Sequence, residues 1–282
     1  MSNKRSRSEI VTIVTVSHSF TAISDQIATY FVSENSTLYL CDACLTFFAS
    51  ENHLVQHITD CAHLFWVPGN EIYRNKEKKF CVYEIDGRNL RSFLFLRRLG
   101  ILTRFFLPEK VTLDDVHFFA FYALFEVDDY GFHFVGYFSK EWRKNSACVN
   151  TLSCVMVLPP YRAKGYGSFL GELSYELARQ DGMVGTPERP LSGSGKLLFR
   201  KVWKGEVLRA IHLIDSSKSV VTLNTLCQMT GLIVEDVLVG LEDLGIMFTR
   251  NKQSPFIILL EEKKTALNKR RLQPQLLQWV PC

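Results

Sequence analysis

The feature that most constrains the fold of this 282-residue chain is a short cluster of cysteines completed by one histidine. Two residues separate Cys41 from Cys44, twelve residues follow, and three residues separate His57 from Cys61. Thiolates and an imidazole at this spacing are typical of tetrahedral zinc. We expect Cys41 and Cys44 in a turn, and His57 and Cys61 on one face of a helix. Because four protein ligands leave no open position on the ion, the pattern predicts a structural zinc and not a catalytic one.

The remaining cysteines do not indicate a disulfide framework, since three of the eight lie in this cluster and the other five are scattered. Buried thiols beside a surface histidine are the alternative to zinc, and the Cys-x-x-Cys pair argues against it. Residues 10–16 are apolar but contain two threonines and no clear cleavage site follows. We therefore interpret them as a buried strand and not as a secretory signal. No apolar run is long enough for a membrane helix, so we expect a soluble, intracellular protein.

The charge of the chain is only mildly basic, with a net charge of +4 and a pI near 8.6. This balance is not that of a dedicated nucleic-acid-binding protein. Basic residues gather near both ends, and they are either solvated termini or a nuclear-import signal. They are Lys4, Arg5, Arg7, Lys263, Lys264, Lys269, Arg270 and Arg271.

We divide the chain into four segments: a lead-in of unknown function at 1–37, a zinc finger at 38–66, an α/β body at 67–205 and a C-terminal subdomain at 206–282. The body should contain a strand at 80–85, a helix at 93–106 and a hairpin of strands 118–127 and 133–138 around the turn 128–131. Residues 151–158 predict a short, central, buried strand. A helix should run from 165 to about 179.

The C-terminal segment has the element order of a winged helix. Thr222 can cap a helix that stops at Gly231, and a second helix is expected over 234–244. Strands at 246–249 and 256–260 should follow. Such modules bind DNA or pack on a neighbouring domain, and we favour packing because an acidic recognition helix would repel phosphates. The acidic residues of the second helix are Glu235, Asp236, Glu242 and Asp243.

A loop with two glycines joins the strand at 151–158 to the helix that follows. Gly165 and Gly167 allow the backbone to approach a ligand closely, and the N–H groups at the helix start can point at anionic oxygens. Arg162 and Lys164 add positive charge. The loop lacks the dinucleotide fingerprint and is too short for a P-loop. An ordinary glycine turn that begins a helix is the alternative to an anion-binding loop.

Residues 151–167, TLSCVMVLPPYRAKGYG, resemble the acetyl-CoA motif of the MYST histone acetyltransferases. Residues 184–192, VGTPERPLS, resemble the next signature of that family. Shorter matches occur at 71–74, 84–87 and 135–140, and the zinc spacing matches too. The likeness extends over about residues 38–282. It implies an α/β (α+β) fold with a GNAT-like acetyltransferase core, an N-terminal zinc finger and a C-terminal winged-helix-like subdomain.

The resemblance implies an enzyme that transfers acetyl from acetyl-CoA to a protein lysine, with roles for three side chains. Glu188 corresponds to the general base that takes a proton from the lysine ammonium. Cys154 corresponds to the active-site cysteine, which either carries acetyl transiently or shapes the site, and we favour the second role. Lys110 corresponds to the lysine that becomes autoacetylated in the family.

The resemblance also implies which residues contact acetyl-CoA, with some departures from the family pattern. The family has Gln-Arg where this chain has Arg162 and Ala163, so we expect pyrophosphate binding with altered geometry. An acidic residue is replaced by Gly193, and a cofactor-binding serine by Lys201, which could meet a phosphate. The expected contacts are Val155, Val157, Arg162, Ala163, Lys164, Gly165, Tyr166, Gly167, Ser168, Ser192 and Lys201.

The family further implies a nuclear protein of chromatin and transcription regulation, with histone tails as substrates and other subunits of a chromatin complex as partners. Direct DNA binding stays open. One alternative is a catalytically weak scaffold subunit, which the altered loop permits and the retention of Glu188 and Cys154 argues against. A second is a zinc-finger and winged-helix nucleic-acid-binding protein. A third is a small-amine acetyltransferase of the broader GNAT type, which the zinc cluster and the Glu188 motif disfavour.

Overall fold

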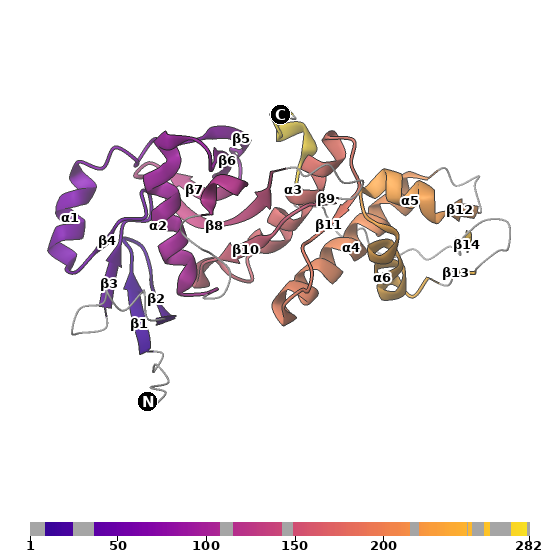
Figure 1. Ribbon diagram of the computed structural model, residues 1–282, viewed down its shortest axis with the longest axis horizontal. Coiled ribbons are helices and arrows are strands. Elements are labelled where there is room, and N and C mark those ends of the chain that lie inside the picture. The colour runs from indigo at the N-terminus through magenta and orange to yellow at the C-terminus, as the bar shows by residue number, and fades with distance from the viewer. Residues whose placement is uncertain are drawn as a thin grey trace. The chain divides into compact units, whose positions relative to one another are not determined.

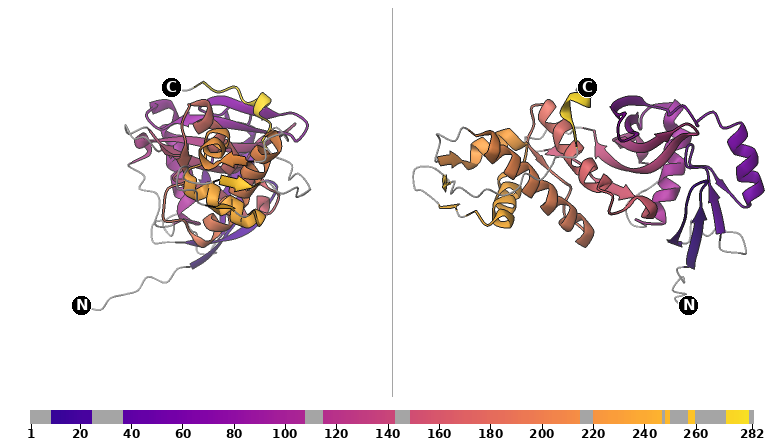
Figure 2. Two further views of the ribbon diagram at one scale, coloured as in Figure 1. Left: turned by 90° about the vertical axis from the view of Figure 1, so that its right-hand side faces the viewer. Right: turned by 180° about the vertical axis from the view of Figure 1, so that it is seen from behind.

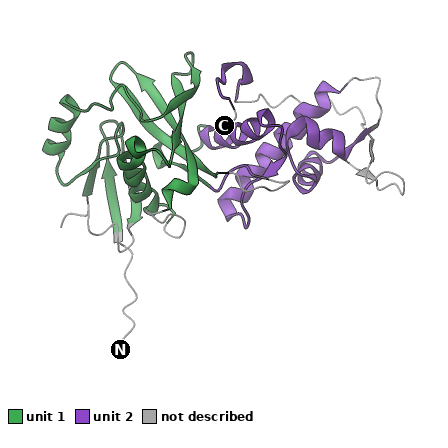
Figure 3. Ribbon diagram, turned by 45° about the horizontal axis from the view of Figure 1, so that its top comes forward, with its two compact units in different colours: residues 1–142, 154–164 green, residues 143–153, 165–282 purple. Residues whose placement is uncertain are grey.

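The computed structural model describes residues 9–24, 37–107, 115–142, 149–214, 220–246, 248–249, 257–259 and 272–280. The chain divides into two compact units, residues 1–142 with 154–164 and residues 143–153 with 165–282 (Figure 3). The first unit contains β1 (Glu9–Val14), β2 (Ser19–Ser24), β3 (Thr37–Leu40), β4 (Phe47–Phe48), α1 (Glu51–Thr59), β5 (Asn70–Asn75), β6 (Phe80–Asp86), α2 (Phe93–Arg104), β7 (Phe119–Asp128), β8 (Gly131–Glu141) and β10 (Cys154–Val157) (Figure 1). The second contains β9 (Val149–Asn150), α3 (Tyr166–Gln180), β11 (Gly185–Thr186), α4 (Gly193–Leu213), β12 (Val220–Thr222), α5 (Leu223–Thr230), α6 (Val234–Leu244), β13 (Phe248–Thr249) and β14 (Ile257–Leu259). The mixed α/β class is confirmed, and the four-segment division stays a prediction.

The core of the first unit is a five-stranded sheet with the order β10-β8-β7-β6-β5. The predicted hairpin is confirmed: β7 and β8 pair antiparallel, and Oδ1 of Asp128 accepts hydrogen bonds from the N–H groups of Tyr130 (2.8 Å) and Gly131 (3.1 Å). The predicted helix α2 lies against one face of the sheet, as the view from behind in Figure 2 shows. The rings of Phe95 and Phe125 are 6.4 Å apart. Packing of this apolar face holds the helix on the sheet.

Strand β10 differs from its prediction, because it lies at the edge of the described sheet and not at its centre. It pairs antiparallel with β8, where Val157 lies opposite Gly136. A Cβ atom at Gly136 would stand 2.3 Å from the carbonyl oxygen of Met156, so only glycine allows β8 and β10 to come this close. A short apolar run is compatible with either a central or an edge strand, which explains the error. An edge position leaves one side of the strand's backbone without a neighbouring strand in the described part of the chain.

A second sheet, with the order β2-β1-β3-β4, leads into the cysteine cluster. The strand expected at 10–16 forms as β1, but only one face of it is buried, because Val11 and Ile13 lie in the core while Ile10 is 71% exposed. β2 is an additional strand that pairs antiparallel with it. β1 also pairs in parallel with β3, which ends one residue before Cys41. Part of the lead-in therefore belongs to the sheet that carries the predicted metal site.

The second unit is built on three helices that pack at close range. A Cβ atom at Gly171 of α3 would lie 2.9 Å from Val202 of α4, and one at Gly240 of α6 would lie 3.0 Å from the carbonyl oxygen of Trp203. Glycines at these two contacts let the helices approach one another more closely than larger residues would. Helix α4 was not predicted, and it continues across position 205, where we expected the core to end.

The C-terminal part of the second unit has the predicted helix, helix and two-strand order, and β12 adds a third strand in the order β12-β14-β13. Thr222 caps α5 through its side chain, which accepts from the N–H of Thr225, and Gly231 ends the helix in the left-handed conformation. Helix α6 buries Val237 and Leu241. Among the described residues, no helix has both the length and the apolar character needed to cross a bilayer.

Candidate active site and metal centre

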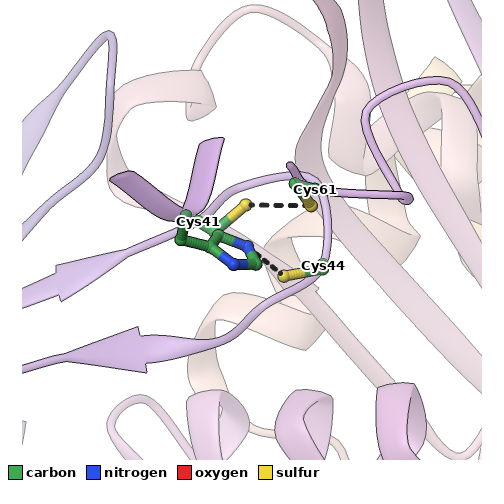
Figure 4. Close-up of side chains that lie close together, drawn as sticks. Cys41, Cys44 and Cys61 are labelled. Carbon is green, nitrogen blue, oxygen red and sulfur yellow. Dashed lines mark hydrogen bonds between the residues drawn. The ribbon is translucent and has the colours of Figure 1, made fainter. Parts of the chain in front are cut away.

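The four predicted metal ligands come together in the first unit. The donor atoms of Cys41, Cys44, His57 and Cys61 all lie within 4.8 Å of one another. Sγ of Cys41 is 3.9 Å from Sγ of Cys61, and Sγ of Cys44 is 3.2 Å from Nε2 of His57 (Figure 4). A tetrahedral zinc with ordinary bond lengths would place its ligand atoms about 3.5–3.8 Å apart. The cluster therefore fits zinc in donor type, number and spacing.

Local structure explains how each ligand reaches the cluster. Cys41 and Cys44 lie in the turn after β3, which is closed by a 2.8 Å bond from the N–H of Leu45 to the carbonyl of Cys41. His57 lies in the last turn of α1. The expectation that Cys61 shares this helix is wrong, because α1 ends at Thr59 and Cys61 follows it. A 3.4 Å bond from the N–H of Cys61 to the carbonyl of Ile58 nonetheless turns the chain back toward the cluster.

The thiols of the cluster have unequal acidities. A hydrogen bond from Cys41 lowers the pKa of Cys44 to about 4, and this same bond and burial raise the pKa of Cys41. Burial raises the pKa of Cys61. The thiolate is the form that binds metal. A divalent zinc ion at the cluster would therefore favour deprotonation of all three cysteines.

The zinc unit is fastened to the five-stranded sheet by polar contacts. Nδ1 of His133 on β8 lies 3.0 Å from Oδ2 of Asp42, which stands between the first two ligands, and Nε2 lies 3.0 Å from Oδ1 of Asp128. The N–H of Phe134 donates to the carbonyl of Asp42 at 2.9 Å. Hydrogen bonding to Asp42 is the main reason that the pKa of His133 is raised to about 9. The metal centre and the sheet therefore share a charged hydrogen-bond network.

The strand β10 carries three of the predicted site residues. Cys154, Val155 and Val157 are partly exposed, whereas Met156 is buried in the core of the unit. The buried Tyr137 on β8 has its pKa raised chiefly by burial, and the nearby Cys154 adds to this effect. Cys154 thus lies close enough to Tyr137 to influence its pKa, while the residue itself is only partly buried.

The loop after β10 has an unusual backbone. Ala163 has a φ of 60° and Gly165 a φ of 95°, so two nearby residues adopt the left-handed conformation. An alanine in this region is uncommon and is strained. Nε of Arg162 donates to the carbonyl of Val157 at 3.0 Å, and the ammonium of Lys164 lies 5.1 Å from the centroid of the Tyr161 ring. The predicted basic side chains are thus held close to the loop itself.

Helix α3 begins directly after this loop. Its N-cap is Gly165, and no side chain caps its first turn. The first turn contains the predicted contact residues Tyr166, Gly167 and Ser168, and the first hydrogen bond of the helix runs from the N–H of Phe169 to the carbonyl of Gly165 at 3.0 Å. A helix start without a side-chain cap has the electrostatics that suit an anionic group.

The segment that contains Glu188 is held by backbone pairing within the second unit. β11 pairs in parallel with β9, and the N–H of Thr151 donates to the carbonyl of Thr186 at 2.9 Å. Two residues further on, the N–H of Glu188 donates to the carbonyl of Leu152, also at 2.9 Å. The side chain of Glu188 is half-buried. The backbone of Glu188 is therefore held in place, and the residue as a whole is only partly shielded from solvent.

The remaining predicted cofactor contacts lie on α4. The hydroxyl of Ser192 accepts from the N–H of Gly195 at 3.1 Å and caps the helix. Lys201 is exposed on the same helix. A Cβ atom at Gly193 would meet nothing within 4 Å, so packing does not require the loss of the family's acidic residue there. The roles of Ser192 and Lys201 toward acetyl-CoA stay predictions.

Comparison with known proteins then identifies the family. The sequence pattern of the MOZ/SAS family matches residues 66–278. The chain belongs to the MOZ/SAS family. It is 37% identical over 238 residues to the histone acetyltransferase Tip60 homolog of Caenorhabditis elegans, which covers 81% of this chain and 50% of that protein. It is 39% identical over 236 residues to histone acetyltransferase esa1 of Emericella nidulans, covering 80% of this chain and 44% of the relative.

A longer relative is the human histone acetyltransferase KAT6A, which is 36% identical over 237 residues, covering 81% of this chain and 11% of the relative. The chain thus spans about half the length, or less, of these curated relatives. The MOZ/SAS match confirms the resemblance to the MYST acetyltransferases. It includes β10, the loop, α3 and the segment that contains Glu188.

Two glutamates from the shorter family motifs accept hydrogen bonds within the five-stranded sheet. The carboxylate of Glu71 accepts from Arg74 (2.6 Å) and from the hydroxyl of Tyr83 (2.9 Å). Glu84 accepts from Tyr122 at 2.8 Å. These motifs therefore stabilise the sheet. The predicted modification site Lys110 lies outside the described residues.

Sequence reasoning missed a second group of polar side chains near Glu188. Arg189 contacts Asp236 of α6, and Asp236 in turn contacts Tyr175 of α3. Asp236 was counted among the acidic residues of α6 that would repel phosphates, but its side chain is fully buried and cannot act in this way. Sequence offers no direct signal for this pairing, since Arg189 and Asp236 lie 47 positions apart.

Proposed function

We propose that this protein is a lysine acetyltransferase that moves acetyl from acetyl-CoA to the side-chain amine of a protein lysine. The observation that carries the proposal is the MOZ/SAS match over residues 66–278, which spans every residue with a predicted role in catalysis or acetyl-CoA binding. Relatives at 36–39% identity are named histone acetyltransferases. The uncapped start of α3 supports the same function, since acetyl-CoA carries a pyrophosphate.

The proposed reaction needs a base for the lysine ammonium. Glu188 takes one proton, and the neutral amine attacks the carbonyl carbon of the thioester. A C–N bond forms, the C–S bond breaks, and the CoA sulfur leaves as a thiolate that acquires the second proton lost by the attacking nitrogen. The half-buried position of Glu188 and its bond to Leu152 suit a base that must be fixed and yet lose its proton to water.

Each unit contains residues with a proposed role toward acetyl-CoA, on β10 and its loop in the first unit and in the first turn of α3 in the second. The edge of β10 at Val155 and Val157 can accept the pantetheine chain by backbone hydrogen bonds. Ala163 and Gly165 have left-handed backbone conformations, which are found in loops whose N–H groups bind anions such as a pyrophosphate. Cys154, being partly exposed on this strand, shapes the site in this proposal and does not carry the acetyl group.

The proposed substrates are histone tails, and the proposed location is the nucleus, because the relatives named above are histone acetyltransferases. Partner subunits of a chromatin complex and autoacetylation at Lys110 belong to the same proposal. Zinc at the cluster of Cys41, Cys44, His57 and Cys61 would support the fold and take no part in the transfer, since the four protein ligands fill its coordination sphere.

The test is acetyl transfer from labelled acetyl-CoA to core histones by the wild type and two variants. We expect Glu188→Gln to lower kcat by about 10²- to 10⁴-fold while acetyl-CoA still binds. Cys154→Ala should retain at least about a tenth of the rate if the thiol only shapes the site. If the wild type binds no acetyl-CoA and labels no histone, the proposal fails and a scaffold role replaces it.

A further inference from the structure

Glu188 is followed by a residue whose side chain reaches into the core of the second unit. The guanidinium of Arg189 lies 2.5 Å from Oδ1 of Asp236, whose side chain has 0% exposure, while that of Arg189 is 50% exposed. Arg189 also contacts the hydroxyl of Thr186 at 3.4 Å. The guanidinium of Arg189 therefore links both ends of the segment 186–189, which contains Glu188.

The carboxylate of Asp236 is itself held by two further helices. Oδ2 accepts from the hydroxyl of Tyr175 at 3.1 Å, and that hydroxyl accepts from Nε1 of Trp203 at 2.7 Å. Tyr175 and Trp203 are both buried, at 1% and 3% exposure. Asp236 thus has fixed partners from α3 and, through Tyr175, from α4, which leaves its carboxylate with one orientation.

Burial raises the pKa of Asp236, and its charged and hydrogen-bonding neighbours offset only part of this effect. Asp236 lies in the first turn of α6, where the helix dipole favours a carboxylate. A buried carboxylate without a cation would be strongly unfavourable, so Asp236 and Arg189 hold each other in place. Asp243 of the same helix pairs with Arg200 of α4 at the surface. Among the described residues, no hydrogen bond or ion pair is seen between this pair and residues 186–189.

We propose that Asp236 is a positioning residue for Glu188, acting through Arg189 to fix the segment whose backbone is bound on its other side by Leu152. This inference rests on the proposed function, since it assumes that Glu188 is the base. Two attachments, the 2.9 Å backbone bond of Glu188 and the ion pair of its neighbour, restrict where the carboxylate can lie. A displacement of about 1 Å in a reacting group can lower a rate by about a hundredfold.

The test measures kcat and KM for acetyl-CoA in the full chain with Asp236→Asn, which keeps the shape and removes the charge. We expect kcat to fall by about tenfold or more, and KM to change by less than about threefold. Arg189→Gln should lower kcat by the same factor. Arg189→Lys keeps a cation at this position and should therefore retain most of the wild-type kcat. The matched control Asp243→Asn removes a carboxylate from the same helix and should leave kcat unchanged.

A second measurement separates positioning from a general loss of structure. In a Glu188→Gln background, Asp236→Asn should cause little further loss, because a missing base cannot be misplaced. In hydrogen exchange, peptides that cover residues 184–190 should exchange faster in Asp236→Asn than in the wild type. Thermal unfolding shows whether each variant is folded at the assay temperature.

The outcomes distinguish this inference from the proposed function. If Glu188→Gln lowers kcat but Asp236→Asn does not, Asp236 is not a positioning residue and the proposed function stands. Additive losses in the double variant, or an equal loss in Asp243→Asn, would also overturn the positioning role. If Glu188→Gln leaves kcat unchanged, the base assignment fails and the inference fails with it.

Discussion

His133 is placed between two carboxylates, and this makes stability depend on pH. Hydrogen bonds to Asp42 and then Asp128 raise the pKa of His133 to about 9, against 6.5 for an ordinary histidine. Because the pKa is raised in the folded state, the stabilisation is fully present below about pH 6.5 and is lost as the pH rises through about 9. We expect this contribution to be about 1–3 kcal/mol, since Asp128 is partly exposed to solvent.

The measurement is urea unfolding of the wild type and His133→Gln at pH 6.5 and pH 9.5, with the same zinc concentration in both. At pH 6.5 the wild type should be more stable than His133→Gln, and at pH 9.5 most of this difference between the two proteins should be absent. A difference that does not change between the two pH values would show that the imidazole contributes by packing and not by its charge.

At the same scale, sequence predicted some residues well and others not at all. The four metal ligands were identified because their spacing is local and the chemistry of thiolates and imidazole is specific. The pairing of Asp236 with Arg189 could not be predicted, because it depends on how α6 packs onto α3 and α4. Nothing in the sequence indicates that Asp236 is buried, since acidic residues are rarely buried unless they are paired.

Among the structural elements, β10 depends on a single glycine of its neighbour. The Cβ of Gly136→Ala would meet the carbonyl oxygen of Met156, a backbone atom that cannot move without displacing the strand. We expect this variant to lower the free energy of unfolding by about 1–3 kcal/mol and to weaken acetyl-CoA binding. Denaturant unfolding and isothermal titration with acetyl-CoA measure the two effects. Unchanged affinity together with reduced stability would show that β10 does not contact the cofactor.

Helix α4 offers the opposite case, because a glycine there has open space. A Cβ atom at Gly205 would meet nothing within 4 Å, and the residue lies inside the helix. Gly205→Ala should raise the free energy of unfolding by about 0.5–1 kcal/mol through reduced freedom of the unfolded chain. Denaturant unfolding of this variant beside Gly136→Ala measures the contrast. A destabilised Gly205→Ala protein would contradict the described packing of α4.

The elements that sequence predicted are those with a clear local pattern. The hairpin β7–β8 was found because two apolar runs lie on either side of a turn sequence from Asp128 to Gly131. Helix α4 was missed because it contains three glycines, and glycine is a poor helix former. Gly193 and Gly195 lie in its first turn and Gly205 lies in its interior. The edge position of β10 was missed because the apolar run specifies a strand but not its neighbours.

For the whole molecule, zinc should stabilise the first unit and leave the core of the second unaffected. The cysteine cluster forms a small core of its own with Ala43 and Leu54, and Arg98 of α2 donates to the carbonyl of Cys44 at 3.3 Å. Metal bound a thousandfold above its Kd contributes about 4 kcal/mol to the state that binds it. Removal by a chelator should therefore lower the unfolding temperature markedly.

Hydrogen exchange after chelation locates the effect. Peptides that cover residues 37–64 and 131–134 should exchange faster, because Phe132 and Phe134 donate to carbonyls of the zinc unit. Peptides from the middle of α3 and α4 should keep their protection. One zinc per chain is expected by elemental analysis before chelation, and a protein with no bound zinc and unchanged exchange would contradict the metal site.

At the scale of the whole chain, the family match and the zinc cluster cover different residues of the first unit. The zinc cluster lies outside the matched residues 66–278, yet β8 connects to it through His133 and Phe134. The sequence predicted the class and the family from separated motifs in a fixed order. It could not predict that part of the lead-in joins the sheet of the zinc unit, because the parallel pairing of β1 with β3 is not local.

The central claim is that the protein transfers acetyl to a lysine amine, and the most direct measurement compares two products of one reaction. Wild-type protein is incubated with acetyl-CoA and core histones, and the free CoA thiol and the acetyl-lysine formed are both quantified. We predict equal amounts of the two, with both strongly reduced in Glu188→Gln. CoA released without acetyl-lysine, or neither product from protein that binds acetyl-CoA, would contradict the proposed function.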